Sequence, residues 1–179
     1  MKATAGAGVL VILVLAAGCA TESADRPLVP SAPVTSSSAL TLPQARSTAA
    51  PGMPDRTLTP GSRFPGVGVE QVCASGYSRR ARLVLPEQYR AVYGAYGLPY
   101  PQPAGTYELD HLIPLELGGD NSNSNLWPEP STPLPGFHEK DELENALHDL
   151  VCSGHMALSA AQSGIASDWV GMYLQYRHP

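Results

Sequence analysis

The sequence predicts a small α+β domain preceded by a disordered tether. The segment "ELDHLIPLELGGDNSNSNLWPEP", from Glu108 to Pro130, has two short apolar stretches around a Gly-Gly turn and an Asn-rich loop, which favours two short strands. The next segment, residues 138–152, has leucines at helical spacing. Ahead of residue 63, Pro, Ser, Thr and Ala dominate, a composition that buries too little apolar surface to fold.

The first 19 residues are typical of a secretory signal peptide. One Lys is followed by an apolar run from Val9 to Ala17 and by a small residue before Cys19. The run is shorter than the ~20 residues that a membrane-spanning helix needs. The segment "LAAGC" resembles the lipobox of bacterial lipoproteins, which implies a lipidated Cys19 and a chain anchored to the outer side of the cytoplasmic membrane. Plain signal cleavage, with a secreted chain, is the alternative.

Residues 20–62 are predicted to form a flexible linker, and residues 63–179 to form one domain of ordinary size. If Cys19 carries lipid, Cys73 and Cys152 remain, and an exported chain with two cysteines usually bridges them. Two buried free thiols are the alternative. No Cys-x-x-Cys pair occurs, which argues against a zinc site built on cysteines.

The first elements of the domain follow from local patterns. "ARLVL", residues 81–85, is expected to be a short strand. A helix is expected to begin at Pro86 and to end at Gly97, because apolar side chains recur at helical spacing between them. The prolines between residues 99 and 103 then force a loop.

The middle of the domain is predicted to run strand, turn, strand, helix. Gly118 and Gly119 tolerate positive φ at the turn. The helix at 138–152 is expected to be capped by Gly154. Its apolar face consists of Leu143, Leu147, Leu150 and Val151. Two short helices are expected to close the chain, the first with a capping box of Ser159 and Gln162.

This order, and the residues in it, resemble the HNH endonuclease family. The matching residues are Asp110-His111, Pro114, Gly118-Gly119, Asn125-Leu126 and a following helix with histidines. The resemblance covers about residues 107–154, and the segments "CASGY" and "KDELENALHDLVCSG" are similar to segments of exported HNH-like proteins. It implies a small ββα-metal core with additional helices.

The resemblance also implies a role for each motif residue. His111 matches the general base, and Asp110 and Asn125 supply oxygen ligands for one divalent metal, Mg²⁺ or Mn²⁺, with Zn²⁺ as a further candidate. Neighbouring strand residues point to opposite faces, so a working Asp-His pair is expected to need a bend or bulge. Pro114 is compatible with a disrupted strand end.

Two histidines compete for the last position of the motif. His138 and His148 are separated by about 15 Å of helix, too far to share one metal. His138 would lie opposite the leucine stripe, whereas His148 lies at its edge beside Glu144. We therefore expect His148 to be the third metal ligand, with His138 as the fallback if the helix begins late. A solvated helix residue is the alternative for either.

Charge argues against a simple nucleic-acid binder. From residue 63 onward the chain has six Arg and one Lys but thirteen Asp and Glu, so the predicted domain is acidic. Nucleic-acid binders usually present a basic surface. Arg79, Arg80 and Arg82 nevertheless cluster ahead of the motif. If the fold brings them beside Asp110, they form a substrate-binding clamp for phosphate. A solvated basic segment that balances "HEKDELE" is the alternative.

Together these patterns predict a metal-dependent endonuclease that hydrolyses DNA or RNA outside the cytoplasmic membrane. A non-catalytic HNH-like binding lipoprotein of the cell envelope is the first alternative, favoured by the acidic balance. A structural envelope protein with a coincidental motif is the second. Nucleic acid is the expected partner, the membrane is contacted through the N-terminal lipid only, and the sequence indicates no protein partner.

Overall fold

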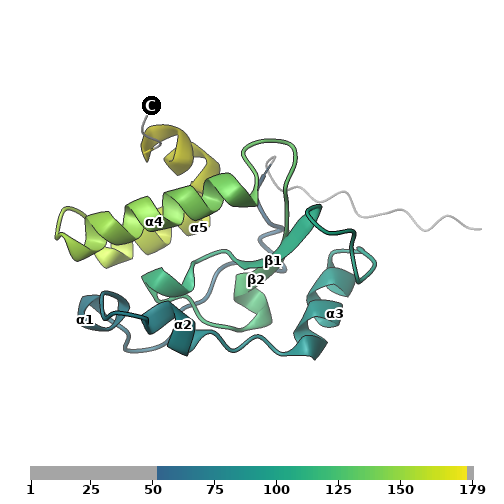
Figure 1. Cartoon of the computed structure of the whole chain (residues 1–179), viewed down its shortest axis with the longest axis horizontal. Helices are drawn as coiled ribbons and strands as arrows, with labels where there is room; N and C mark the ends of the chain where they lie inside the picture. The colour runs from purple at the N-terminus through teal and green to yellow at the C-terminus, as the bar shows by residue number, and fades with distance from the viewer. Residues whose placement is uncertain (1–51, 177–179) are drawn as a thin grey trace, which may run out of the picture. The chain divides into compact units, whose positions relative to one another are not determined.

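The computed structural model describes residues 52–176 of the chain. The elements in order are α1 (Val69–Val72), α2 (Tyr77–Ala81), α3 (Pro86–Ala95), β1 (Tyr107–His111), the 3₁₀ helices η1 (Leu115–Leu117) and η2 (Asn123–Asn125), β2 (Leu126–Pro130), α4 (Phe137–Cys152) and α5 (Leu158–Tyr176) (Figure 1). This mixture of helices and a two-stranded sheet confirms the α+β class. The predicted signal peptide, Cys19 and most of the predicted linker lie outside the described residues.

The two strands pair antiparallel in an unbroken register, from Tyr107 opposite Pro130 to His111 opposite Leu126. Because side chains alternate along a regular strand, Asp110 and His111 point to opposite faces of the sheet. Helix α4 packs on β1 and helix α3 packs on β2 (Figure 1). The expected bend or bulge at the Asp-His pair is therefore absent from this sheet.

Helix α3 begins at the predicted proline. The Gln88 side chain accepts a hydrogen bond from the Leu85 N–H, 2.9 Å long, which satisfies one of the free donors at the start of the helix. Val92 and Tyr93 are buried against the sheet residues Leu109 and Leu126. The predicted helix at this place is confirmed, and it fixes the face of the sheet on which His111 lies.

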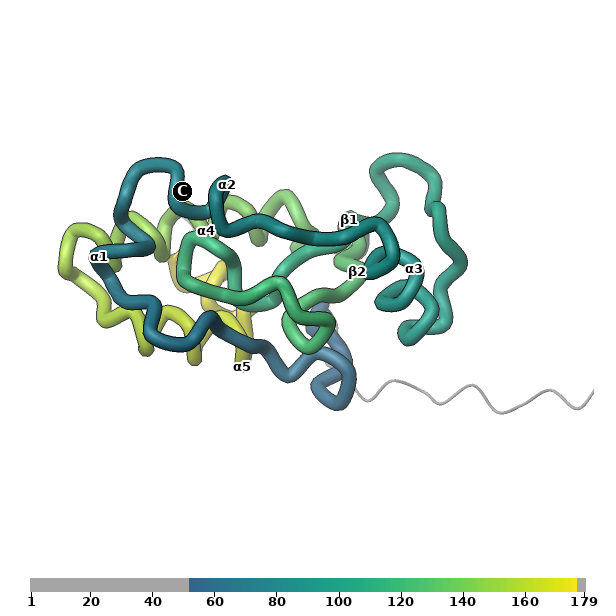
Figure 2. The backbone as a smooth tube through the Cα atoms, turned by 90° about the horizontal axis from the view of Figure 1, so that it is seen from below, coloured from purple at the N-terminus to yellow at the C-terminus, as the bar shows by residue number. Residues whose placement is uncertain are grey.

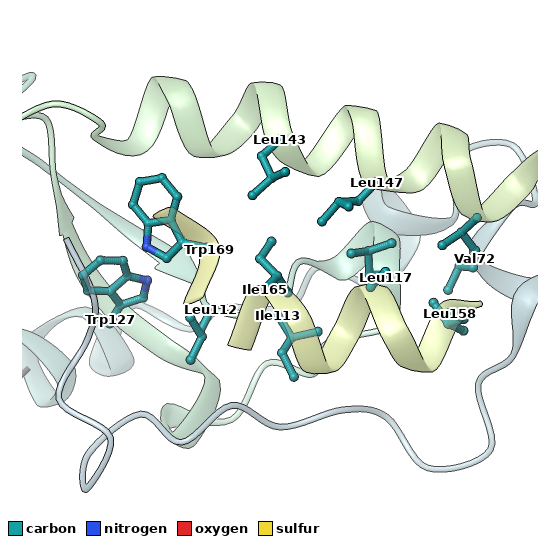
Figure 3. Close-up of a cluster of buried hydrophobic side chains, with 12 residues drawn as sticks. Val72, Leu112, Ile113, Leu117, Trp127, Leu143, Leu147, Leu158, Ile165 and Trp169 are labelled. Carbon is teal, nitrogen blue, oxygen red and sulfur yellow. The ribbon is translucent and has the colours of Figure 1, made fainter. Parts of the chain in front are cut away.

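The main core lies between α4 and α5. Leu143 and Leu147 of α4 point towards Ile165 of α5 and Leu117 of η1 (Figure 3). Both leucines and Val151 are buried, as the helical spacing predicts, whereas Leu150, which was expected on the same face, is only half-buried. This packing fixes the rotation of α4 about its axis, and with it the face that α4 presents to β1.

The predicted strand at residues 81–85 is wrong. Ala81 ends α2, and Leu83 and Leu85 lie in an extended segment outside the sheet, with 67% and 43% of their surface exposed. The Leu83 N–H donates instead to the side chain of Asn121, at 3.1 Å. Strand propensity needs a partner strand and a buried face, and this segment has neither in the structure.

The predicted capping box at Ser159 and Gln162 is also wrong. The Gln162 amide accepts a hydrogen bond from Arg63 at 2.7 Å and donates one to the Leu117 carbonyl at 2.7 Å. Helix α5 is interrupted at Asp168, where φ is −164° and ψ is 74°. The Asp168 carboxylate accepts a hydrogen bond from the Gly171 N–H at 2.9 Å, so it caps a second helical segment.

The folded domain includes residues that were predicted to be linker. The Trp169 indole donates a hydrogen bond to the Gly52 carbonyl, 2.7 Å long, and the buried Thr59 hydroxyl donates to the Leu126 carbonyl, 2.9 Å long. Figure 2 shows the chain running from this segment past α5 to α1. Residues 52–62 therefore belong to the domain. No helix in the range 52–176 is long and apolar enough to cross a membrane.

Candidate active site

The Asp110 carboxylate of β1 forms an ion pair with Lys140 of α4. The Lys140 Nζ lies 2.5 Å from Asp110 Oδ2 and 2.8 Å from the His111 carbonyl oxygen, and it also donates to Glu144 Oε1. Glu129 Oε2 of β2 is 3.8 Å away. The Lys140 side chain is fully buried, at 0% exposure. Three carboxyl groups and a carbonyl thus surround one ammonium group.

The charges of this carboxyl and lysine cluster are set by burial and by Lys140. Burial opposes ionisation of Asp110, but the Lys140 charge and hydrogen bond more than offset it and lower the pKa of Asp110. Burial raises the pKa of Glu129 well above its usual value and that of Glu144 to about 8. Burial alone would lower the pKa of Lys140, yet the three carboxyl groups raise it well above the usual value. The lowered pKa of Asp110 and the raised pKa of Lys140 favour a charged Asp110–Lys140 pair, and a pKa of about 8 leaves Glu144 mostly protonated at neutral pH.

His111 is held in one tautomer by Asn121. The Asn121 Nδ2 donates to the Ala81 carbonyl at 2.8 Å, which turns Oδ1 towards His111 Nε2, 3.2 Å away. An amide oxygen only accepts, so Nε2 carries the proton and Nδ1 has the lone pair. His111 is 1% exposed, and Nδ1 is buried without a hydrogen-bond partner. The structure thus holds an unused basic nitrogen at the end of β1.

The surroundings keep the His111 ring neutral. Burial lowers the pKa of His111 below its ordinary value, although Asp110 and the hydrogen bond to Asn121 act in the opposite direction. The Arg82 guanidinium contributes to the same lowering of the His111 pKa. A neutral imidazole with a free lone pair is the form that accepts a proton near pH 7.

Asn125 has a structural role. Its Oδ1 accepts hydrogen bonds from the N–H groups of Ile113, at 2.9 Å, and Ser62, at 3.3 Å. Its Nδ2 donates to the carbonyls of Ile113 and Asp120, both at 2.9 Å. The side chain is fully buried, and these four bonds use its whole hydrogen-bonding capacity. Asn125 therefore ties together the loop after β1 and does not face Asp110 as the expected second ligand.

Gly119 explains why this loop needs its Gly-Gly turn. A Cβ atom at Gly119 would lie 1.7 Å from the Ile113 carbonyl oxygen and 2.8 Å from Asn125 Nδ2. The first glycine, Gly118, has a φ of 82°, in the left-handed region. The turn residues of the motif thus allow the backbone to close tightly around the Asn125 amide.

His148 lies next to the disulfide and away from Asp110. Its Nε2 is 3.1 Å from the Val72 carbonyl oxygen and 3.4 Å from Cys152 Sγ. Eight residues of helix, about 12 Å, separate it from Lys140. Cys73 and Cys152 form a disulfide that joins the ends of α1 and α4, with a Cα separation of 5.6 Å. The structure therefore does not assemble Asp110, Asn125 and His148 into one ligand set.

Three His, Cys, Asp or Glu side chains that lie close enough together could hold a metal ion. Among the described residues one such group, Cys73, His148 and Cys152, has its ligand atoms within 4.8 Å of one another. Its two sulfur atoms are bonded to each other. The fallback residue, His138, is exposed, and its ring lies edge-on to Phe137, with 4.3 Å between the centroids. The divalent ion that the resemblance implies thus finds no fitting set in the residues expected to hold it.

Two of the three predicted arginines share a pocket. Arg79 and Arg82 line a pocket of about 300 Å³ between α2, η1 and α4, which we call the arginine pocket, together with Ser78, Glu116 and Glu144. Arg80 instead donates to the Ser75 carbonyl at 2.7 Å. In the range 52–176, all three contacts within 4.0 Å between a basic side chain and a carboxyl group involve Lys140, so no carboxyl group pairs with the Arg79 and Arg82 guanidinium groups, which are available to an anionic ligand.

Sequence reasoning missed four residues of this site: Asn121, Glu129, Lys140 and Glu144. A signal for three of them was present. Lys140 and Glu144 are four residues apart on the predicted helix. Pairing the two strands about the Gly-Gly turn puts Glu129 on the same face as Asp110. Nothing in the sequence indicated a role for Asn121. Its side chain bonds to the backbone of residues 81–83, and that segment was expected to be a strand.

Comparisons of the chain with protein-family models, with curated proteins and with solved structures found no match, so the resemblance to HNH endonucleases rests on the motif residues themselves.

Proposed function

We propose that the chain is an HNH-like phosphodiester hydrolase that acts on DNA or RNA, with His111 as its general base. The single observation that carries the proposal is the Nδ1 atom of His111. It is buried, has no partner, belongs to a neutral ring, and is fixed by the bond from Nε2 to Asn121. Most buried polar side-chain atoms have a hydrogen-bond partner, so a ring nitrogen without one calls for an explanation beyond packing, and a role as a base supplies it. The order β1, turn, β2, α4 supports the same reading.

In the proposed reaction, the attacking water gives up a proton to His111 Nδ1 as its oxygen bonds to phosphorus, and because His111 is 1% exposed, a local opening beside the end of β1 has to admit this water. Arg79 and Arg82 bind the non-bridging phosphate oxygens and stabilise the charge that grows on them. Glu144 lines the same pocket as the two arginines and has a pKa raised to about 8, and we assign it the role of donating a proton to the leaving oxygen. The buried ion pair of Asp110 and Lys140 holds β1 against α4 and so positions His111.

A divalent ion, Mg²⁺ or Mn²⁺, remains a proposal from the resemblance. The roles proposed for His111, Arg82 and Glu144 do not require the set of Asp110, Asn125 and His148 to bind it. Asp110 is neutralised by Lys140, and the amide of Asn125 is fully used.

A second candidate function is binding of nucleic acid without cleavage, as a lipoprotein of the cell envelope. The pairing of Asp110 with Lys140 and the fully used amide of Asn125 favour this candidate. A site whose expected metal ligands are occupied by protein groups can still bind phosphate through its arginines without cleaving it. The acidic balance of the chain, with a net charge of −5, favours weak rather than tight binding.

The deciding experiment incubates the full-length oxidised protein, in mild detergent, with single-stranded and duplex DNA and RNA, with Mg²⁺, Mn²⁺ or EDTA. His111→Ala is compared with His138→Ala, a matched change at an exposed histidine. We expect cleavage that is lost in His111→Ala and kept in His138→Ala. Cleavage unchanged in His111→Ala would refute the proposed base. Binding without cleavage by the folded wild type would establish the second candidate.

We also propose that the chain is exported and anchored through a lipid on Cys19, a residue outside the described range. The change Cys19→Ala should move the protein from the membrane fraction to the soluble fraction of the producing bacterium. An unaltered distribution would exclude the lipid anchor, and an unprocessed N-terminus in the mature chain would exclude export by signal cleavage.

A further inference from the structure

A second pocket adjoins the arginine pocket, and four tyrosines line it. It has a volume of about 400 Å³ and lies between α3, the loop at residues 99–106 and β1; we call it the tyrosine pocket. Its lining includes Tyr89, Tyr93, Tyr100, Tyr107, Arg82 and Glu108. Nothing in the motif of His111 accounts for this cavity, because the motif begins only at the end of β1.

The tyrosines form a supported aromatic wall. The Tyr100 ring centroid lies 5.3 Å from that of Tyr93 and 5.6 Å from that of Tyr89, and Tyr93 lies 6.5 Å from Tyr107. Tyr93 is buried, at 3% exposure, whereas Tyr100 has 42% of its surface exposed. Because the Tyr100 ring contacts the buried Tyr93 and the half-buried Tyr89, it loses little conformational freedom when a flat group stacks on it.

Arg82 lines both pockets. A ligand that fills both therefore has a flat apolar group on the tyrosines and an anionic group at the arginines, with one guanidinium between them. Glu108 at the tyrosine pocket repels a phosphate there and leaves the arginine pocket as the place for the anion. A nucleobase and its neighbouring phosphate have this combination of a flat apolar ring and an adjacent anionic group.

We propose that the tyrosine pocket binds one unpaired nucleobase next to the phosphate held by Arg82, so that the substrate is single-stranded nucleic acid. This inference rests on the proposed function for its phosphate site. A base within a duplex has both faces covered by its neighbours and cannot stack on the Tyr100 ring, whereas every unpaired base has a face free to stack. The pocket thus selects for strand state and not for sequence.

The test measures fluorescence anisotropy of a labelled six-nucleotide single strand and of a hairpin duplex of matched charge. The full-length protein carries His111→Ala in every sample, so that no cleavage interferes. Tyr100→Ala, which removes the stacking ring, is compared with Tyr100→Phe, which keeps it. Tyr176→Ala, at a tyrosine of another pocket, is the matched control. Thermal unfolding verifies that each variant is folded.

We expect tighter binding of the single strand than of the duplex, a loss of about 10-fold or more in Tyr100→Ala, and wild-type affinity in Tyr100→Phe and Tyr176→Ala. Equal affinity for single strand and duplex, or an unaffected Tyr100→Ala, would overturn the inference. If cleavage depends on His111 and Tyr100→Ala still binds normally, the proposed function stands and the base pocket fails. Binding that depends on Tyr100 without any cleavage supports the pocket and rejects the catalytic proposal.

Discussion

The Lys140 ammonium lies 2.5 Å from the Asp110 carboxylate, and both side chains are shielded from water, at 0% and 10% exposure. Removing one partner of a buried ion pair leaves an uncompensated charge in the interior. We therefore expect Lys140→Met to lower the free energy of unfolding by about 3 to 5 kcal/mol, measured by urea denaturation. Asp141→Asn, at the exposed neighbouring position, is the control and should cost much less.

The double variant Asp110→Leu with Lys140→Met tests the pair itself. Because both charges disappear together, we expect it to be more stable than the sum of the two single changes allows. Strict additivity of the three free energies of unfolding would mean that Asp110 and Lys140 do not interact.

The pKa of His111 gives a second prediction. Its folded value lies below the usual value of about 6.5, so the unfolded chain takes up this proton at a higher pH than the folded chain does. Neutral His111 therefore contributes to the free energy of unfolding in full above about pH 6.5, and this contribution is lost as the pH falls through the folded pKa. NMR titration of the His111 ring should show this lowered pKa. A His111 pKa at or above 6.5 would remove the physical basis for the proposed base.

Glu144 should act on stability in the opposite pH range. Its pKa of about 8 in the folded protein exceeds the value of about 4.3 for an unfolded chain. At low pH the Glu144 carboxyl group is protonated in both the folded and the unfolded chain, and its contribution to the free energy of unfolding is then at its largest. From about pH 4.3 upward the unfolded chain loses this proton first, so this contribution falls until the pH passes about 8.

The variant Glu144→Gln has no such proton to lose. Denaturant unfolding between pH 5 and pH 8 should therefore give a flatter dependence of stability on pH for Glu144→Gln than for the wild type. Glu142→Gln, at an exposed position on the same helix, should keep the wild-type slope. Parallel curves for Glu144→Gln and wild type would place the Glu144 pKa near its ordinary value.

Asn125 provides a test that separates a structural amide from a metal ligand. Asn125→Ala removes hydrogen bonds to Ile113 and Asp120 and leaves buried backbone groups unsatisfied, for which we expect a loss of roughly 2 to 4 kcal/mol in the free energy of unfolding. The loss should be equal in EDTA and in saturating Mn²⁺. If Mn²⁺ stabilised the wild type and not the variant, Asn125 would be a ligand after all.

The sequence was sufficient to predict the elements that carry a periodic pattern. Leu143, Leu147 and Val151 of the predicted stripe are buried and α3 begins at its proline, because both features depend on local spacing. The segment from Arg82 to Leu85 was misassigned, since its apolar residues favour a strand but no neighbour is left to pair with it. The start of the domain was also missed, because Thr59 and Gly52 are held by partners far along the chain, Leu126 and Trp169.

The motif alone could name Asp110, His111 and Asn125, but not what each contacts. The register of two strands decides that Asp110 and His111 face opposite sides, and the rotation of α4 decides that Lys140 and not His148 reaches Asp110. Both the strand register and the rotation of α4 depend on packing between residues that are 15 to 30 positions apart in the sequence. The spacing of Lys140 and Glu144 and the pairing of Glu129 were visible in the sequence, but that Lys140 reaches Asp110 was not, because this contact depends on how α4 packs on β1.

The bridge between Cys73 and Cys152 encloses β1, β2, Arg82 and both pockets within one covalent loop. A protease that cuts the exposed loop near Pro103 would separate Arg82 from His111 in sequence, yet both fragments would remain joined through the sulfur atoms. In surroundings where proteases are abundant, a single cut is therefore not sufficient to release either half, and the two pockets can survive as a nicked but intact unit.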